Sequence, residues 1–192
     1  MIAIVKYNAG NILSVSYALD RLGYKNIVTD DPEIIQRSEK VILPGVGEAH
    51  TSMQYLKDRE LDKILPSLKQ PTLGICLGMH LMCSFSEEGH TTCMNVFPNK
   101  VQRFNDSDLV PHMGWNNFSS VNGLLLHNVK ANENVYYVHS YYACLSEFTK
   151  GECDYINPFS ATLERDNFFA TQFHPERSSD SGKKILKNFL SL

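Results

Sequence analysis

The first 80 residues alternate between short apolar runs and amphipathic stretches, and this alternation limits the possible folds more than any other feature of the sequence. The apolar runs have the length and composition of buried strands. They are Ile2–Tyr7, Asn26–Thr29, Val41–Leu43 and Thr72–Ile75. Strands separated by helices form a parallel sheet that is covered by helices on both faces. The sequence therefore predicts an α/β fold with an open, mostly parallel sheet.

Local signals mark where the helices between these strands begin and end. Gly23 follows an apolar-periodic stretch and is expected to stop its helix. Asp31 and Pro32 are typical of a helix N-cap and of the first helical position. Further helical patterns cover Ala49–Lys57 and Leu61–Leu68, and a turn is expected at Asn8–Asn11.

The second half of the chain has a different pattern, in which short β-like segments are separated by turn residues. These segments are Val101–Phe104, Asn134–Val138, Tyr141–Leu145, Ser160–Leu163 and Phe168–Phe173. They predict an antiparallel extension of the sheet. A last helix is expected from about Ser181 to Leu190. No linker divides the chain, so we predict one domain over residues 1–192.

Composition excludes several classes of function. The chain has 192 residues, a net charge of −3 and no basic tract, which argues against nucleic-acid binding. No apolar run approaches the roughly 20 residues of a membrane span, and the N-terminus lacks the features of a signal peptide. The five cysteines include no CxxC pair and no zinc-type cluster, so no metal is expected. These features predict a cytoplasmic protein.

One cysteine stands in a position typical of a nucleophile. Cys76 lies between Gly74 and Gly78, where an apolar strand ends and a helix begins. A nucleophile elbow has this arrangement, with a strained residue at a sharp turn. The helix N-terminus favours the thiolate, and the amide of Leu77 is expected to face an oxyanion. The other four cysteines are expected to be packing residues.

A histidine and a glutamate at the end of the last apolar segment provide a candidate base. In extended backbone, residues two apart face the same side, so His174 and Glu176 are expected to be adjacent. An imidazole can take a thiol proton while a carboxylate fixes its tautomer. Alone, His174 is more simply an exposed loop histidine, but with Cys76 the two residues form a candidate triad. His139 is a weaker candidate for the same site.

Together these motifs resemble those of the class I, or triad-type, glutamine amidotransferases. The segments that carry the resemblance span almost the whole chain. They are Tyr7–Asn11, Pro44–Gly47, Gly74–Met79, His112–Asn116, Val138–Tyr141 and Phe173–Glu176. Their combination is most similar to the glutaminase subunits of imidazole glycerol phosphate synthases. The resemblance implies the flavodoxin-like fold of that family and a role in histidine biosynthesis.

The resemblance also implies a mechanism without a cofactor. Cys76 would attack the side-chain amide of glutamine, His174 would transfer protons, and Glu176 would orient His174. Backbone amides of Leu77, Gly45 and Val46 would hold the oxyanion, and Gly47, His80 and Ser140 would contact the substrate.

In the family, the released ammonia passes to a separate (β/α)₈ cyclase subunit, which forms imidazole glycerol phosphate and aminoimidazole carboxamide ribotide. A chain of 192 residues is too short to hold that synthase as well, so a heterodimer is expected. By family position, Asn11, Trp115 and Arg177 are candidates for the docking face or for its coupling to the site. For Trp115, packing in the core is an equal alternative.

Two positions depart from the family pattern. His80 replaces the usual Gln, and Arg177 replaces the usual Lys. A charged His80 would lower the pKa of Cys76, and glutamine binding would become weaker or pH-sensitive. The alternative is that His80 fills the space passively. Arg177 keeps the charge but changes its geometry.

Other interpretations of the chain remain open. It would be a glutaminase for a different acceptor synthase, a non-catalytic assembly subunit, or a cysteine hydrolase with an acyl or peptide substrate. A cyclase that binds the chain would exclude the first, and glutaminase activity would exclude the other two.

Overall fold

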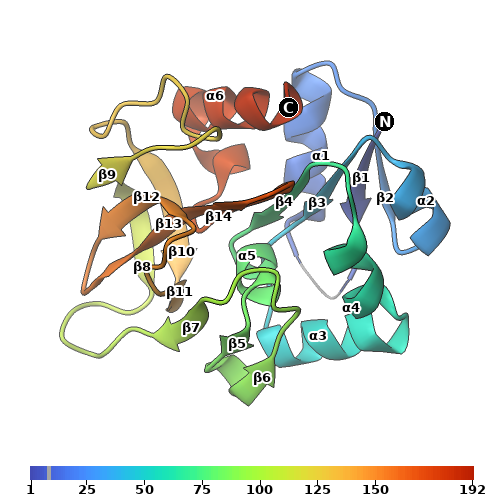
Figure 1. Ribbon diagram of the computed structural model, residues 1–192. Coiled ribbons are helices and arrows are strands. Elements are labelled where there is room, and N and C mark those ends of the chain that lie inside the picture. The colour runs from blue at the N-terminus through green and yellow to red at the C-terminus, as the bar shows by residue number, and fades with distance from the viewer. Residues whose placement is uncertain (8–9) are drawn as a thin grey trace.

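The computed structural model describes residues 1–7 and 10–192, and its centre is an eight-stranded sheet (Figure 1). The expected turn at Asn8–Asn11 therefore lies partly outside the described residues. The first five strands of the sheet are parallel. In spatial order they are β2 (Asn26–Thr29), β1 (Ile2–Val5), β3 (Lys40–Leu43), β4 (Thr72–Ile75) and β14 (Phe168–Thr171). The sheet continues antiparallel through β13 (Pro158–Arg165), β12 (Thr149–Asp154) and β9 (Ser120–Val121).

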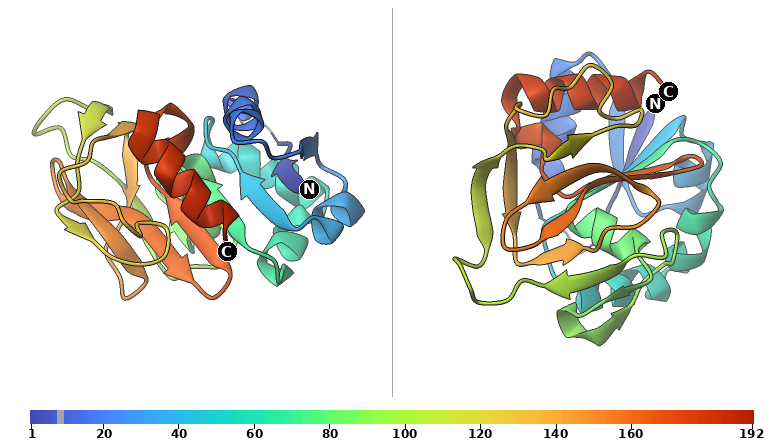
Figure 2. Two further views of the ribbon diagram at one scale, coloured as in Figure 1. Left: turned by 90° about the horizontal axis from the view of Figure 1, so that it is seen from above. Right: turned by 60° about the vertical axis from the view of Figure 1, so that its left-hand side comes forward.

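Helices cover both faces of the sheet, as the alternating pattern predicted. One face packs against α1 (Ile12–Arg21) and α6 (Ser179–Leu190). The other packs against α2 (Pro32–Arg37), α3 (Ala49–Asp58), α4 (Leu61–Ile64) and α5 (Leu77–Met82). Figure 1 shows α1 and α6 above the sheet and α3, α4 and α5 below it, and Figure 2 shows the same layers from two other sides.

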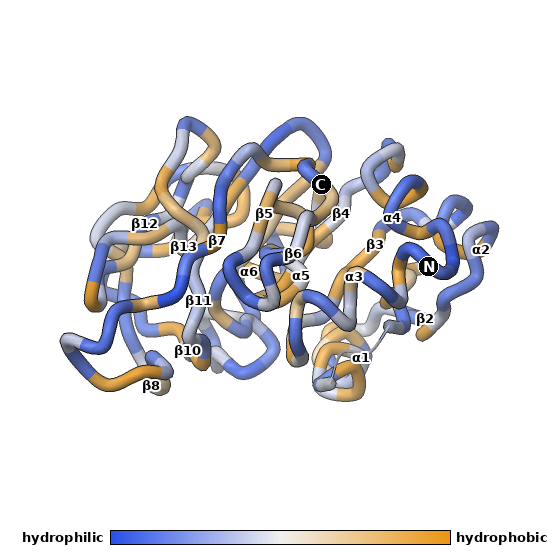
Figure 3. The backbone as a smooth tube through the Cα atoms, turned by 90° about the horizontal axis from the view of Figure 1, so that it is seen from below, coloured by the Kyte–Doolittle hydropathy of each residue, from blue (hydrophilic) through white to orange (hydrophobic). Residues whose placement is uncertain are grey.

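Strand β1 illustrates why two separate cores form. Ile2 and Ile4 pack into the core on the α1 side, whereas Ala3 and Val5 pack into the other core. Successive side chains of a strand point to opposite faces, so a central strand must be apolar throughout. In Figure 3 the tube is coloured as hydrophobic along β3, and the outer loops are mostly hydrophilic. The predicted α/β class is confirmed.

The helix ends follow the local signals in the sequence. Asp31 caps α2, since its carboxylate accepts the backbone N–H groups of Glu33 and Ile34 at 2.8 and 3.4 Å. Gly23 has a φ of +83°, the left-handed conformation that ends a helix. The expected helix over Leu61–Leu68 is shorter: α4 ends at Ile64, and a 3₁₀ turn, η1 (Leu65–Ser67), follows because Pro66 cannot donate a helical hydrogen bond.

The second half is more divided than the sequence predicted. Strand β8 (His112–Asn116) pairs with β10 (Val135–His139) in a separate two-stranded sheet. A four-stranded sheet contains β11 (Tyr141–Ala143), β7 (Lys100–Arg103), β5 (Phe85–Ser86) and β6 (Thr91–Thr92). Three of the five predicted segments thus lie outside the extension, and β14 pairs parallel with β4. Helix α6 begins two residues earlier than expected, at Ser179.

The parallel order brings three loops to one edge of the sheet. Strands β3, β4 and β14 are neighbours, and their carboxyl ends lead into Pro44–Gly47, Cys76 and Phe173–Glu176. Crevices at this edge are the usual ligand sites of open α/β sheets. In the described part of the chain, no helix has the length and apolar character needed to cross a membrane.

Candidate active site

Cys76 occupies a strained turn between β4 and α5. Its backbone has φ +48° and ψ −103°, outside the regions that non-glycine residues prefer. A hydrogen bond from the Cys76 N–H to the Thr171 carbonyl, at 2.7 Å, stabilises this turn. A side chain at Gly78 would place its Cβ 2.2 Å from the Leu43 carbonyl oxygen, so only glycine allows α5 to pack this closely on β3. This geometry is that of the predicted elbow.

The imidazole of His174 and the carboxylate of Glu176 are in direct contact. Nδ1 of His174 lies 2.8 Å from Oε1 of Glu176, and both side chains are fully buried. The contact has a different origin from the one expected from extended backbone. Glu176 lies in a 3₁₀ turn, η3 (Pro175–Arg177), which brings the carboxylate back toward the ring. A carboxylate can only accept here, so Nδ1 carries the proton.

The electrostatics favour a charged His174. Burial alone would lower its pKa, but the charge and hydrogen bonding of a Cys76 thiolate, together with Glu176, raise the pKa of His174 to about 10. Its Nε2 is buried and has no hydrogen bond at normal distance among the described residues. Catalytic hydrogen bonds are often long before substrate binds. The raised pKa of His174 favours an imidazolium beside Cys76, and Nε2 is the ring nitrogen left to exchange a proton with the sulfur.

A cavity of about 300 Å³ opens over Cys76. Seven of the residues predicted for the site line it, and they come from three separate segments of the chain. They are Gly45, Val46, Gly47, Cys76, Leu77, His80 and Ser140. His139 also lines it, as its weaker candidacy suggested. The residues Glu88, Pro111, Val138 and Tyr141 complete the wall. The size fits an amino acid rather than a macromolecular substrate.

Two backbone segments meet where an oxyanion would form. Leu77 is the first residue of α5, so its N–H has no intrahelical partner. Gly45 lies against it: a Cβ on Gly45 would be 2.8 Å from the Leu77 nitrogen and 1.7 Å from the Ile75 carbonyl oxygen. Only glycine can therefore occupy position 45. Gly45, Val46, Gly47 and Leu77 all line the same cavity.

His80 is neutral at physiological pH, which favours neither a charged ring beside Cys76 nor its effect on the sulfur. It is buried, and desolvation lowers its pKa to about 4, although a hydrogen bond to Gln172 partly opposes this. Nε2 of His80 lies 2.9 Å from Oε1 of Gln172. The ring therefore has a specific partner instead of filling space passively.

The wall opposite α5 contains a chain of neutral histidines. Nδ1 of His139 lies 2.8 Å from the Tyr141 carbonyl, which can only accept, so Nδ1 carries the proton. Nε2 of His139 then accepts from Nδ1 of His112 at 3.0 Å, and Asn116 donates to the other ring nitrogen of His112 at 3.4 Å. Burial lowers the pKa of both rings, that of His112 to about 4. Both are therefore neutral at physiological pH.

The three candidates for the docking face lie in different settings. Asn11 donates from Nδ2 to Oε1 of Glu176, and its Oδ1 accepts from Arg177 at 3.2 Å. Arg177 is exposed. Trp115 is 55% exposed on β8 and has only edge contact with Tyr136, which excludes packing in the core. Asn11 and Arg177 are thus directly connected to the candidate triad.

Sequence reasoning missed Glu88 and Gln172. Glu88 lines the cavity, and one of its oxygens accepts the Ala49 N–H at 2.9 Å. Burial raises the pKa of Glu88, and its bond to Ala49 opposes the rise. Gln172 was visible two residues before His174, but nothing in the pattern indicated that its amide would reach Cys76 Sγ, at 3.7 Å.

The remaining cysteines are distant from this chemistry. All five cysteines are unpaired, and Cys83, Cys93 and Cys153 are buried while Cys144 is half-buried. Burial raises the pKa of all four, as expected of packing residues. Across residues 1–7 and 10–192, no three His, Cys, Asp or Glu side chains are grouped so that they could hold a metal ion.

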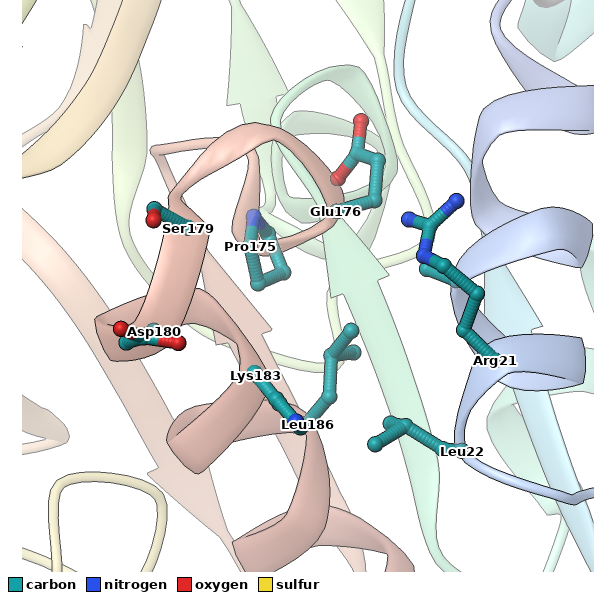
Figure 4. A pocket seen from close by; sticks show the side chains of 9 residues that line it. Arg21, Leu22, Pro175, Glu176, Ser179, Asp180, Lys183 and Leu186 are labelled. Carbon is teal, nitrogen blue, oxygen red and sulfur yellow. The ribbon is translucent and has the colours of Figure 1, made fainter.

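A second cavity, of about 240 Å³, lies behind Glu176, between α1 and α6. Figure 4 shows Arg21 of α1 beside Glu176 at this hollow, with Lys183 and Asp180 farther along α6. The described residues that line it include no cysteine or histidine. The reacting centre is therefore the cavity over Cys76.

Comparison with known proteins agrees with this geometry. The sequence model of the family described as "Glutamine amidotransferase class-I" matches residues 5–192. The imidazole glycerol phosphate synthase subunit HisH of Bacteroides fragilis is 54% identical over 194 residues, covering 100% of this chain and 99% of the relative. HisH of Pasteurella multocida is 43% identical, covering 98% and 96%.

Solved structures agree on the fold. The crystal structure of a glutamine amidotransferase aligns with a TM-score of 0.78 at 16% identity, over 99% of this chain and 97% of that one. PurLQS from Thermotoga maritima aligns with a TM-score of 0.68 at 16% identity, over 99% and 97%. With the family match over nearly the full length, these findings show that the chain belongs to the class-I glutamine amidotransferases.

Proposed function

We propose that this chain hydrolyses glutamine to glutamate and ammonia, and that it supplies the ammonia to a cyclase subunit in histidine biosynthesis. The cyclase would form imidazole glycerol phosphate and aminoimidazole carboxamide ribotide. The observation that carries the glutaminase activity is that Cys76, which lines the cavity, acts on the pKa of His174, whose ring is paired with the buried Glu176. The full-length identity of 54% to HisH supports the pathway.

In the first half of the reaction the thiolate of Cys76 attacks the side-chain amide carbon of glutamine. His174 is the proton donor for this half of the reaction, because the Cys76 charge and Glu176 raise its pKa and favour the imidazolium. The tetrahedral intermediate collapses as His174 donates this proton to the amide nitrogen, and ammonia leaves. A thioester between Cys76 and the glutamyl group remains.

In the second half a water molecule attacks the thioester, and His174 accepts one of its protons. The second tetrahedral intermediate releases glutamate and restores the Cys76 thiolate. Both intermediates carry an oxyanion, which the amides of Leu77 and of the Gly45–Gly47 loop would stabilise. The close packing of Gly45 against Ile75 and Leu77 holds the two backbone segments next to each other.

Glu88 supplies a charge for substrate recognition. Among the described residues that line the cavity it is the one acidic side chain. Free glutamine carries an α-ammonium group, and a carboxylate is its natural partner. Ser140 and Gly47 would hold the remaining polar atoms. This recognition favours the free amino acid over an amide in a peptide, where no α-ammonium exists.

An exposed apolar surface beside the triad would receive the cyclase. Several large side chains are exposed there although a monomer would gain by burying them. They are Leu13 and Tyr17 on α1, Val46, and Met113 and Trp115 on β8. Arg177 adds a charged anchor of the type common at interfaces. We infer a heterodimer in which this surface covers the site and retains the ammonia.

The five free thiols also suggest the compartment. A catalytic thiolate needs a reducing environment to remain unoxidised. All five cysteines of the chain are unpaired. We therefore expect the enzyme to work in the cytoplasm.

The test measures glutamate release by the chain alone and after addition of the cyclase with its nucleotide ligand. We expect a large increase in the complex and no activity in Cys76→Ala, which should still bind the cyclase. Cys144→Ala is the matched control, because Cys144 is half-buried and does not line the cavity. Wild-type rates in Cys76→Ala would contradict the nucleophile, and no effect of the cyclase would indicate another acceptor.

A further inference from the structure

The side chain of Gln172 lies between His80 and Cys76. It is fully buried, in the short segment between β14 and His174. Oε1 of Gln172 is 2.9 Å from Nε2 of His80, and Nε2 of Gln172 is 3.7 Å from Sγ of Cys76. Its backbone N–H donates to the Ala161 carbonyl at 2.9 Å, so the residue has little freedom to move.

The polarity of this contact follows from the groups at its two ends. An amide has one accepting and one donating end. If Oε1 accepts from the Nε2–H of His80, the amide N–H₂ must face the sulfur. A thiolate accepts hydrogen bonds and a neutral thiol donates weakly, so this orientation matches the charged form of Cys76.

We propose that Gln172 is a positioning residue that stabilises the Cys76 thiolate through its amide N–H, and that His80 fixes the amide in this orientation. The inference rests on the proposed function, in which Cys76 is the nucleophile. The Gln172 amide thus provides the sulfur with a hydrogen-bond donor in addition to His174. A buried anion needs such donors, because burial without them is costly.

The position of His80 gives this arrangement its specificity. The His80 ring lies one helical turn after Cys76, on the same side of α5. It donates to Gln172 only when Nε2 carries a proton, as in one of the two neutral tautomers or in the charged ring. Desolvation keeps it neutral near pH 7.

Other groups face Cys76 and enter any pH profile of its reactivity. His174, which immediately precedes η3, has a pKa raised by the Cys76 charge and by Glu176. Tyr7, at the end of β1, is buried, and desolvation and the Cys76 charge raise its pKa. His139, on β10, shares the cavity and is kept neutral by burial. The described lysines and arginines do not line the cavity. Variants at Gln172 leave all these groups in place.

The test is the pH dependence of Cys76 alkylation by iodoacetamide in the full chain, followed by mass spectrometry of the labelled peptide. Gln172→Glu replaces the donor with an oxygen at similar volume, and Gln172→Met removes the donor without adding charge. Gln70→Glu is the matched control, because Gln70 is half-buried and donates to the Ile35 carbonyl, far from the cavity. His80→Leu removes the group that orients the amide.

We expect Gln172→Glu to shift the midpoint of the profile upward by about one pH unit, and to slow alkylation at pH 6 about tenfold. Gln172→Met and His80→Leu should shift it in the same direction by less, and Gln70→Glu should match the wild type. If Gln172→Glu fails to fold, the profile of Gln172→Met tests the proposal. Profiles of Gln172→Met and Gln172→Glu that superimpose on the wild type would overturn the proposal. A wild-type Cys76 that reacts like an ordinary thiol would instead count against the proposed nucleophile.

Discussion

Replacing Glu176 with Gln tests how much of the rate depends on the charge behind His174. The substitution keeps the size of the side chain and one accepting oxygen. It removes the negative charge that lies 2.8 Å from Nδ1 of His174 and that is fully buried. It also changes one partner of Asn11, because Nδ2 of Asn11 donates to Oε1 of Glu176 in the wild-type chain.

The size of the effect can be estimated from the distance. Two unit charges 2.8 Å apart at an effective dielectric constant of about 20 interact by about 6 kcal/mol. The amide retains a neutral hydrogen bond worth about 1 kcal/mol, and breaking a buried pair typically costs about 3–5 kcal/mol. We therefore expect the turnover number to fall about 10²–10⁴-fold. The KM for glutamine should change little, because Glu176 does not line the substrate cavity.

The pH profile should change in a defined direction. Glu176 is one of the groups that raise the pKa of His174 to about 10. Without its charge that pKa falls toward the ordinary value near 6.5. His174 must be protonated to donate to the leaving ammonia, so the basic limb of the profile should move to lower pH.

The assay is glutamate release by the complex with the cyclase, at saturating glutamine, between pH 5 and 10. Glu133→Gln is the matched control: Glu133 pairs with Lys184 at the same distance, 2.8 Å, but lies at the surface beside α6. It should lose at most about 1 kcal/mol of stability and no activity. A turnover number within threefold of wild type in Glu176→Gln would refute the reasoning.

Three further predictions concern stability and partner binding. Gly78→Ala should lower the free energy of unfolding by about 2–4 kcal/mol in urea, since its Cβ would lie 2.2 Å from the Leu43 oxygen; an unchanged midpoint would show that α5 moves freely. Trp115→Ala should weaken cyclase binding by about 2 kcal/mol in calorimetry without changing the melting temperature of the lone chain, because the ring is 55% exposed. His80 has a pKa of about 4 in the fold and about 6.5 when unfolded, so it contributes about 3 kcal/mol of stability above pH 6.5, lost as the pH falls to 4. His80→Gln should flatten that part of the pH–stability curve, and equal slopes would contradict a buried neutral ring.

The parts of the fold that could be predicted are those in which local pattern and tertiary burial agree. Residues Val41–Leu43 of strand β3 are apolar because they are covered on both faces, and α2 begins where Asp31 can cap it. Strand β12, Thr149–Asp154, was missed because its residues are mostly polar and it is defined by its pairing with β13 and β9. Pairing partners are not encoded locally, so the division into three sheets could not be foreseen.

The candidate site follows the same rule. Cys76, His174 and Glu176 were found because each stands in a contiguous motif whose backbone geometry is local. Glu88 and Gln172 were missed because their roles depend on contacts with residues that are distant in the sequence. Glu88 lines the cavity over Cys76, and Gln172 contacts Cys76, which lies almost a hundred positions earlier. The sequence left the charge of His80 open for a related reason, since its pKa depends on a burial that sequence spacing does not reveal.

Cys76 has two groups of hydrogen-bonded residues beside it, one through His174 and one through Gln172, and only the first reaches the surface. This difference limits which property of the site a bound partner can change. From His174 a line of hydrogen bonds leads through Glu176 and Asn11 to the exposed Arg177. From the sulfur the other line leads through Gln172 to His80, which is buried in the core. A partner that binds Arg177 would therefore act on the position and charge of the base, whereas the donor to the thiolate stays fixed. Docking would then change the rate of proton transfer more than the reactivity of the sulfur, and a comparison of the alkylation profile with and without the cyclase separates these two effects.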